Sequence, residues 1–189
     1  LCRATETALQ DPTSLAFDRD GGLYITDERN HVVLFVGRDG YLSIAAGGGG
    51  PEDGVGDGLP AAQASLFFPG GIAVAPDGTL YIADYGNERV RQVGLDGIIR
   101  TVAGTGVSGF EGDGGPATEA RLFGPAAVAL APDGGFYIAD ADNGRVRYVD
   151  PEGTITTFAG TGDFSFGHVA PDGTSALGMA LGRPRGLAL

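Results

Sequence analysis

The chain has 189 residues, and 42% of them are hydrophobic, so it is long enough and apolar enough to bury a core. Its 12 basic side chains, none of them lysine, face 24 acidic ones, and the net charge of −12 opposes binding to nucleic acid or to an anionic membrane surface. We therefore expect no nucleic-acid partner. No apolar run approaches the roughly 18 residues that a membrane-spanning helix needs, so we expect no membrane insertion either.

A long repeat runs through the chain. Prolines stand at positions 12, 69, 125 and 184, at steps of 57, 56 and 59. Three other residue types keep the first two steps: Tyr24, Tyr81 and Tyr137, Asp27, Asp84 and Asp140, and Asn30, Asn87 and Asn143. Such self-similarity indicates a repeat architecture. We expect residues 1–189 to form one partial repeat domain, with units over 12–68, 69–124 and 125–183, and with 184–189 beginning a further unit.

The first unit departs from the others. Val32 and Leu34 stand where the later units carry arginine, and Phe35 and Val36 follow them. We expect the outer surface of this unit to be covered by something that the other units lack. His31 falls at a turn position and is most simply a surface residue.

The second unit shows the secondary structure of the repeat most clearly. Four short apolar runs, over 71–75, 80–83, 89–93 and 98–103, are separated by turns that contain proline, glycine, asparagine or aspartate. This pattern predicts a four-stranded antiparallel sheet. Its first two strands are apolar at nearly every position, which is typical of strands covered on both faces, as in a propeller blade.

The third unit carries the motifs of a known family. An apolar-Tyr-Ile-Ala-Asp run ends at Asp140, and Asn143, the Arg-Val-Arg of 145–147 and the Phe-Ala-Gly of 158–160 follow it. Their order resembles the NHL repeat of bacterial secreted proteins and of animal cell-surface proteins such as teneurins, and the resemblance covers about 180 residues. It implies an all-β fold, a β-propeller segment of four-stranded antiparallel NHL-type blades, here about three blades and the start of a fourth.

The chain ends inside a predicted strand, so we expect either a longer chain or other chains to complete the ring. An incomplete ring would expose apolar surface on the outer faces of its two end blades. An extracellular or cell-surface location is implied by the resemblance and favoured by the acidic composition without lysine.

One polar set recurs from unit to unit. It comprises Asp27, Asp84, Asp140, Asn30, Asn87, Asn143, Arg89, Arg91, Arg145 and Arg147. Because it repeats, we interpret it as structural: aspartate and asparagine side chains satisfy turn amides, and an arginine pairs with a carboxylate on a neighbouring strand. The alternative is a polar binding site.

Two glycine-rich acidic loops connect the units and contain Asp57 and Asp113. Calcium binds carboxylate and carbonyl oxygens, but neither loop has the spacing of a known calcium loop, so we favour solvated connections and expect no cofactor, with calcium as the alternative.

The third connection breaks the pattern and brings together Phe164, Phe166 and His168. These residues are either a binding anchor for a partner or part of the core.

The sequence gives little support to catalysis. The only histidines are His31 and His168, too few for a two-histidine metal centre or a serine-histidine-aspartate relay within the chain. We therefore expect no catalytic or metal site, and a non-catalytic interaction or scaffold module that binds a protein, a glycan or further blades. The alternative, implied by the resemblance, is a metal-dependent lyase or lactonase whose active site is completed by other blades.

Overall fold

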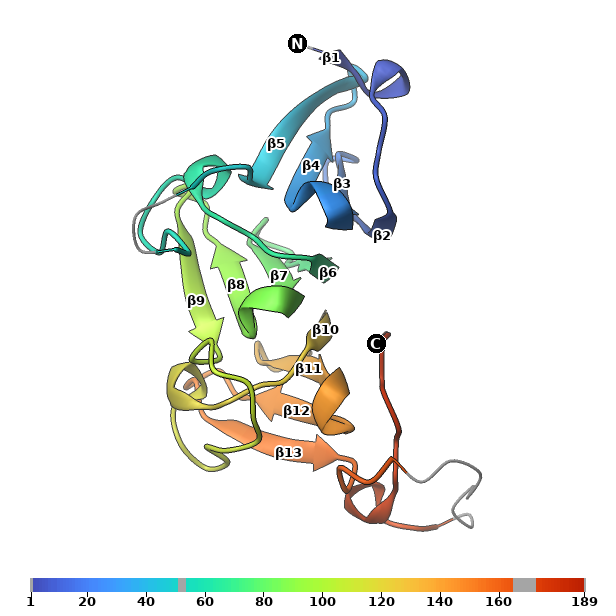
Figure 1. Ribbon diagram of the computed structural model, residues 1–189. Coiled ribbons are helices and arrows are strands. Elements are labelled where there is room, and N and C mark those ends of the chain that lie inside the picture. Colours follow the sequence, from blue (N-terminus) through green and yellow to red (C-terminus); the bar gives the residue numbers. More distant parts are fainter. Residues whose placement is uncertain (1, 51–53, 165–172, 189) are drawn as a thin grey trace.

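Three antiparallel sheets follow one another along an arc in the computed structural model, which describes residues 2–50, 54–164 and 173–188 (Figure 1). The first sheet contains β1 (Cys2–Arg3), β2 (Pro12–Phe17), β3 (Leu23–Asp27), β4 (Val32–Val36) and β5 (Tyr41–Gly47). The second contains β6 (Pro69–Val74), β7 (Leu80–Asp84), β8 (Arg89–Val93) and β9 (Ile99–Ala103). The third contains β10 (Pro125–Leu130), β11 (Phe136–Asp140), β12 (Arg145–Val149) and β13 (Ile155–Ala159). We call these sheets blades one, two and three.

The described helices are all short 3₁₀ turns. Three of them, η2 (Glu28–Asn30), η4 (Tyr85–Asn87) and η6 (Ala141–Asn143), join the second and third of the four consecutive strands of each blade. Three more lie in the segments that lead into a blade, namely η1 (Ala4–Glu6), η3 (Ala61–Gln63) and η5 (Ala117–Glu119), and η7 (Ala176–Gly178) follows blade three.

Each blade is the predicted four-stranded meander, because consecutive strands are hydrogen-bonded neighbours. Blade one has a fifth strand, since β1 pairs with the outer strand β5. The strands β2, β6 and β10 line the concave side of the arc together with the C-terminal residues, and β5, β9 and β13 lie outside (Figure 1). The fold class is therefore the predicted one, an open β-propeller segment.

Neighbouring blades share their cores. Ile82 and Ile99 of blade two are buried with Val33 of blade one, and Ile138 and Ile155 of blade three are buried with Val90 of blade two. Since each sheet is covered by the next, both faces of blade two lie in apolar surroundings. The boundaries of the three repeat units, at 12–68, 69–124 and 125–183, remain a prediction from the sequence.

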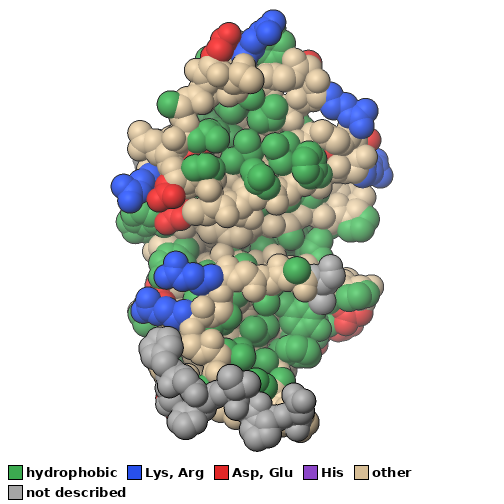
Figure 2. Space-filling view, turned by 90° about the vertical axis from the view of Figure 1, so that its right-hand side faces the viewer, with side chains coloured by type: hydrophobic (Ala, Val, Ile, Leu, Met, Phe, Trp, Pro, Cys, Tyr) green, Lys and Arg blue, Asp and Glu red, His purple; other side chains and the backbone are tan. Residues whose placement is uncertain are grey.

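Apolar side chains are exposed where no further blade covers the arc. On β2 of blade one, Leu15 and Phe17 are 63% and 68% exposed, and Ile44 of β5 is 47% exposed. On β13 of blade three, Phe158 is 52% exposed. Figure 2, which looks onto the concave side, shows hydrophobic side chains gathered over blade one in its upper half. Within the described residues, no helix has the length and apolarity to cross a membrane.

Candidate functional site

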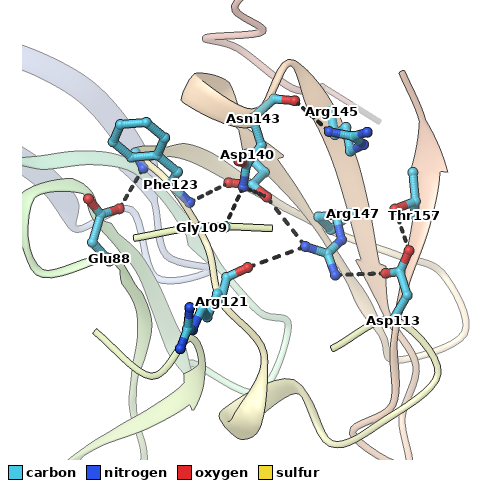
Figure 3. A network of polar contacts seen from close by, with 11 residues as sticks. Glu88, Gly109, Asp113, Arg121, Phe123, Asp140, Asn143, Arg145, Arg147 and Thr157 are labelled. Atoms are coloured by element: carbon cyan, nitrogen blue, oxygen red, sulfur yellow. Dashed lines mark hydrogen bonds and ion pairs between the residues drawn. The ribbon is translucent and has the colours of Figure 1, made fainter. Parts of the chain in front are cut away.

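A polar network holds the turn between β11 and β12 in blade three (Figure 3). One oxygen of Asp140 accepts a hydrogen bond from the Phe123 amide at 2.8 Å, and the other accepts from Asn143 Nδ2 at 2.7 Å. A guanidinium nitrogen of Arg147 lies 3.4 Å from the same carboxylate. Asp140 and Arg147 are fully buried, so the network fixes the turn from within the blade.

Arg147 also binds the segment that enters blade three. Its second terminal nitrogen lies 2.7 Å from Asp113, and the other oxygen of Asp113 accepts a hydrogen bond from Thr157. A single buried arginine therefore links the entering segment, β11 and β12 (Figure 3). In blade two, Arg91 is bound in the same way by Asp84 at 3.3 Å and by Asp57 at 2.7 Å.

These contacts add an anchor to the acidic loops. Asp57 and Asp113 each bind a buried arginine, so the two solvent-exposed loops are tied to the blades. Across the described ranges, no three histidine, cysteine or acidic side chains cluster in a way that could hold a metal ion.

The other predicted arginines fix the exits of the blades. Arg89 donates hydrogen bonds to the carbonyl oxygens of Asn87 and Thr105, and Arg145 donates to those of Asn143 and Thr161. The guanidinium of Arg145 also lies 3.7 Å from the ring centre of Phe110, a favourable cation-π geometry.

Blade one keeps only part of this network. Asp27 accepts hydrogen bonds from the Gln10 amide and from Asn30 Nδ2, both at 2.9 Å. The position of Arg91 and Arg147 is taken by Leu34, which packs with Ile25 and Val32 in an apolar cluster. The described residues provide no ion-pair partner for Asp27, although this carboxylate is 1% exposed.

Burial dominates the protonation of the two paired aspartates. It raises the pKa of Asp84 above its ordinary value, while hydrogen bonds from Phe67, Asn87 and Arg91 oppose the shift. Burial raises the pKa of Asp140 in the same way. Since the arginines lie against both carboxylates, the network is an ion-paired unit whose parts depend on one another.

A second set of contacts crosses from each blade to the next. Nδ1 of His31 accepts a hydrogen bond from the Phe68 amide at 3.0 Å, and Glu88 at the equivalent position of blade two accepts one from the Gly124 amide at 2.6 Å. His31 also packs against the rings of Phe67 and Phe68. His31 thus lies at the predicted turn and is half-buried there, because its imidazole joins blades one and two.

A cleft of about 560 Å³ opens on the concave side of the arc. Ser14, Glu28, Tyr85, Asp142 and Arg185 contribute polar groups to its lining. The Tyr85 hydroxyl donates a hydrogen bond to Asp142 at 2.7 Å, and Arg183 lies 3.0 Å from the other oxygen of Asp142. The hydrogen bond to Asp142 raises the pKa of Tyr85 above its ordinary value, and the charges of Arg183 and Arg185 oppose the shift.

Two exposed phenylalanines lie beside the turns that border the cleft. Phe67 and Phe123 occupy equivalent places in successive units, and they are 45% and 41% exposed. Their carbonyl oxygens accept hydrogen bonds from the amides of Gly86 and Asp142, so each ring is held next to η4 or η6.

We did not select the cleft residues or these phenylalanines from the sequence. The sequence does contain a sign of the cleft residues. Glu28, Tyr85 and Ala141 occupy one repeat position and differ there, while the adjacent aspartates are identical. Of the predicted binding residues, Phe164 is 39% exposed, and Phe166 and His168 lie outside the described residues.

The sequence matches one protein family over most of its length. Residues 48–109 and 107–179 match the family described as the teneurin NHL domain.

Individual relatives match over similar spans. Teneurin-3 of Mus musculus is 34% identical over 165 residues, which cover 77% of this chain and 6% of that protein. Protein SUPPRESSOR OF QUENCHING 1, chloroplastic, of Arabidopsis thaliana is 35% identical over 120 residues, which cover 62% of this chain and 10% of that protein. The chain thus spans a tenth or less of the length of these two relatives.

Solved structures share the fold. A structural genomics protein of unknown function from Bacteroides thetaiotaomicron superimposes with a TM-score of 0.63 at 18% identity, covering 93% of this chain and 41% of that one. A gluconolactonase from Xanthomonas campestris gives a TM-score of 0.59 at 17% identity, covering 80% and 48%. At these identities the similarity concerns the architecture alone.

Proposed function

Because the chain belongs to the teneurin NHL domain family, we propose that it is a non-catalytic scaffold module that binds a protein or glycan partner, in an extracellular or cell-surface setting. Membership of this family supports a propeller segment with a binding or scaffold role. The kind of partner and the surface that contacts it are what we propose.

One observation carries the choice of surface. The aspartate and asparagine of each turn are the same in all three blades, and they are used to hold the blade. The side chains next to them differ from blade to blade and face the cleft or solvent. In repeat proteins the binding surface is typically formed by such varying positions on one face.

Phe67 and Phe123 are the anchors of this surface. Large exposed aromatic side chains that are held in place by their backbone lose little conformational freedom on binding, and such residues dominate the energy of many interfaces. Phe164 supplies a third exposed aromatic ring, on the segment that follows blade three. We assign all three rings to partner contact.

A propeller lactonase or lyase is the second candidate. It is favoured only by the fold shared with the gluconolactonase structure. The contacts of the described residues support the scaffold instead, because Asp57, Asp113 and His31, which belong to the residue types that bind metals, are bound to other groups of the chain.

Binding to arrays tests the proposal. The protein is applied to an array of extracellular protein domains and to a glycan array. Two variants are applied in the same way: a double variant with Phe67→Ser and Phe123→Ser, and a single variant with Phe164→Ala. We expect these variants to bind a detected partner at least about tenfold more weakly, which corresponds to about 1.4 kcal/mol.

Leu95→Ser is the matched control, since Leu95 is 75% exposed and lies in the turn between β8 and β9. It should bind like the parent protein. Equal binding by all variants would contradict the assigned surface. Hydrolysis of gluconolactone by the protein, with one tightly held metal ion per chain, would favour the second candidate.

A further inference from the structure

The cleft on the concave side combines groups that belong to different blades. Glu28 comes from η2 of blade one, Tyr85 from η4 of blade two and Asp142 from η6 of blade three, and Arg185 comes from the C-terminal segment. A volume of about 560 Å³ lies within the usual range for small-molecule sites, about 300–1,000 Å³. The cleft is thus large enough for a small ligand.

The charges in and beside the cleft balance, because the lining contributes Glu28, Asp142 and Arg185 and Arg183 lies beside it. Asp142 is already neutralised by Arg183 at 3.0 Å. The side chains of Glu28 and Arg185 make no hydrogen bond or ion pair within the described part of the chain, so one carboxylate and one guanidinium remain to face a ligand. Balanced charge favours neither a phosphate group, which needs excess positive charge, nor a divalent cation, which needs several carboxylates.

The remaining groups offer hydrogen bonds of both senses beside aromatic surface. Glu28 accepts hydrogen bonds, Arg185 donates them, and the hydroxyl of Ser14 can do both. Phe68 and Tyr85 add rings to the same lining. A compound rich in hydroxyl groups matches such a mixture, because each hydroxyl both donates and accepts and its C–H faces pack against aromatic rings.

From this arrangement we propose that the cleft binds a neutral saccharide of one or two hexose units, with Glu28 and Arg185 each holding hydroxyl groups. This proposal deepens and rests on the binding function proposed above, which includes a glycan partner, by naming the ligand class and the two charged groups that hold it. Glu28 and Arg185 take no part in the contacts assigned to Phe67, Phe123 and Phe164, so the two sets of variants test the two proposals separately.

Calorimetric titration with named sugars tests the site. The protein is titrated with glucose, galactose, mannose, lactose and maltose, and with inorganic phosphate and calcium chloride as charged probes. We expect at least one neutral sugar to bind with a dissociation constant below about 10 mM. Glu28→Gln and Arg185→Gln should each weaken that binding about tenfold, as expected for the loss of a hydrogen bond to a charged group.

The controls are Glu152→Gln and Arg38→Gln, which change exposed residues of the same types outside the cleft. They should bind like the parent protein, and the unfolding midpoint should be the same for all four variants. The proposal is overturned if no neutral sugar binds, if phosphate or calcium binds more tightly than every sugar, or if the cleft variants and the controls bind alike. Loss of array binding in the phenylalanine variants with unchanged sugar binding would separate the two proposals.

Discussion

Blades two and three differ from blade one in how they bury the same turn. In blades two and three, the aspartate that begins the turn is paired with an arginine, which also binds an aspartate of the entering segment. In blade one, Asp27 keeps only its amide and asparagine contacts, and Leu34 replaces the arginine. The turn has the same backbone form in each case, with φ of +54° to +60° at the residue after the 3₁₀ turn.

This difference separates two tasks of the polar network. Aspartate and asparagine suffice to form the turn, because blade one forms it without a cation. The arginine adds a connection to the segment that enters the blade, across 34 residues of sequence. The arginine is therefore needed where a polar, glycine-rich segment must be anchored to a buried blade.

Arg147→Leu should have the largest effect, because it gives blade three the residue of blade one. The substitution leaves Asp113 without its buried partner and Asp140 without a cation. We expect the free energy of unfolding to fall by about 3–5 kcal/mol, as for other broken buried ion pairs. Guanidinium unfolding followed by circular dichroism measures this loss.

The matched control is Arg121→Leu, which removes an arginine whose ion pair with Glu111 is largely exposed. It should cost less than about 1 kcal/mol. If Arg147→Leu lowers the free energy of unfolding no more than this control does, the buried ion pairs do not stabilise blade three. The proposed difference between blade one and the other two blades would then be wrong.

Asp140→Asn and Asp27→Asn compare the two kinds of turn directly. Asp140→Asn removes the negative charge beside a buried arginine, and we expect a loss of about 2–3 kcal/mol. Asp27→Asn removes a carboxylate that has hydrogen bonds but no cation, so about 1 kcal/mol is expected. The two unfolding curves are recorded under identical conditions, and equal losses would show that the arginine does not stabilise the turn.

The sequence predicted the blades because strands and turns are local. Short apolar runs, and the prolines, glycines and asparagines between them, define the meander within each unit. Three sheets of this form are observed. The pairing of an arginine with a carboxylate was also expected. Which carboxylate completes the pair was not, because the position of Asp57 or Asp113 depends on the path of a long irregular segment.

Contacts between blades were harder to predict for the same reason. His31 reaches the amide of a residue 37 positions away, and a lone polar residue in a turn gives no sign of such a partner. The cleft combines Glu28, Tyr85 and Asp142 only after three blades have stacked. Differences among equivalent repeat positions indicated which residues are free to vary, but not what they face.

The smallest expected effect concerns the junctions between blades and their dependence on pH. Burial raises the pKa of Glu88 above its ordinary value of 4.5, with the Gly124 amide opposing the shift and Asp140 and Asp142 adding to it. The folded state therefore favours the protonated form. The contribution of this group to stability is largest below about pH 4.5 and is lost as the pH rises through the folded pKa.

Glu88→Gln should remove this dependence, because the amide side chain keeps an acceptor for Gly124 and does not ionise. Thermal midpoints measured between about pH 4 and pH 8 should show the advantage of the parent protein over Glu88→Gln shrinking as the pH rises. An advantage of the parent protein over Glu88→Gln that grows with pH would show that the Gly124 hydrogen bond, and not burial, controls the carboxyl group.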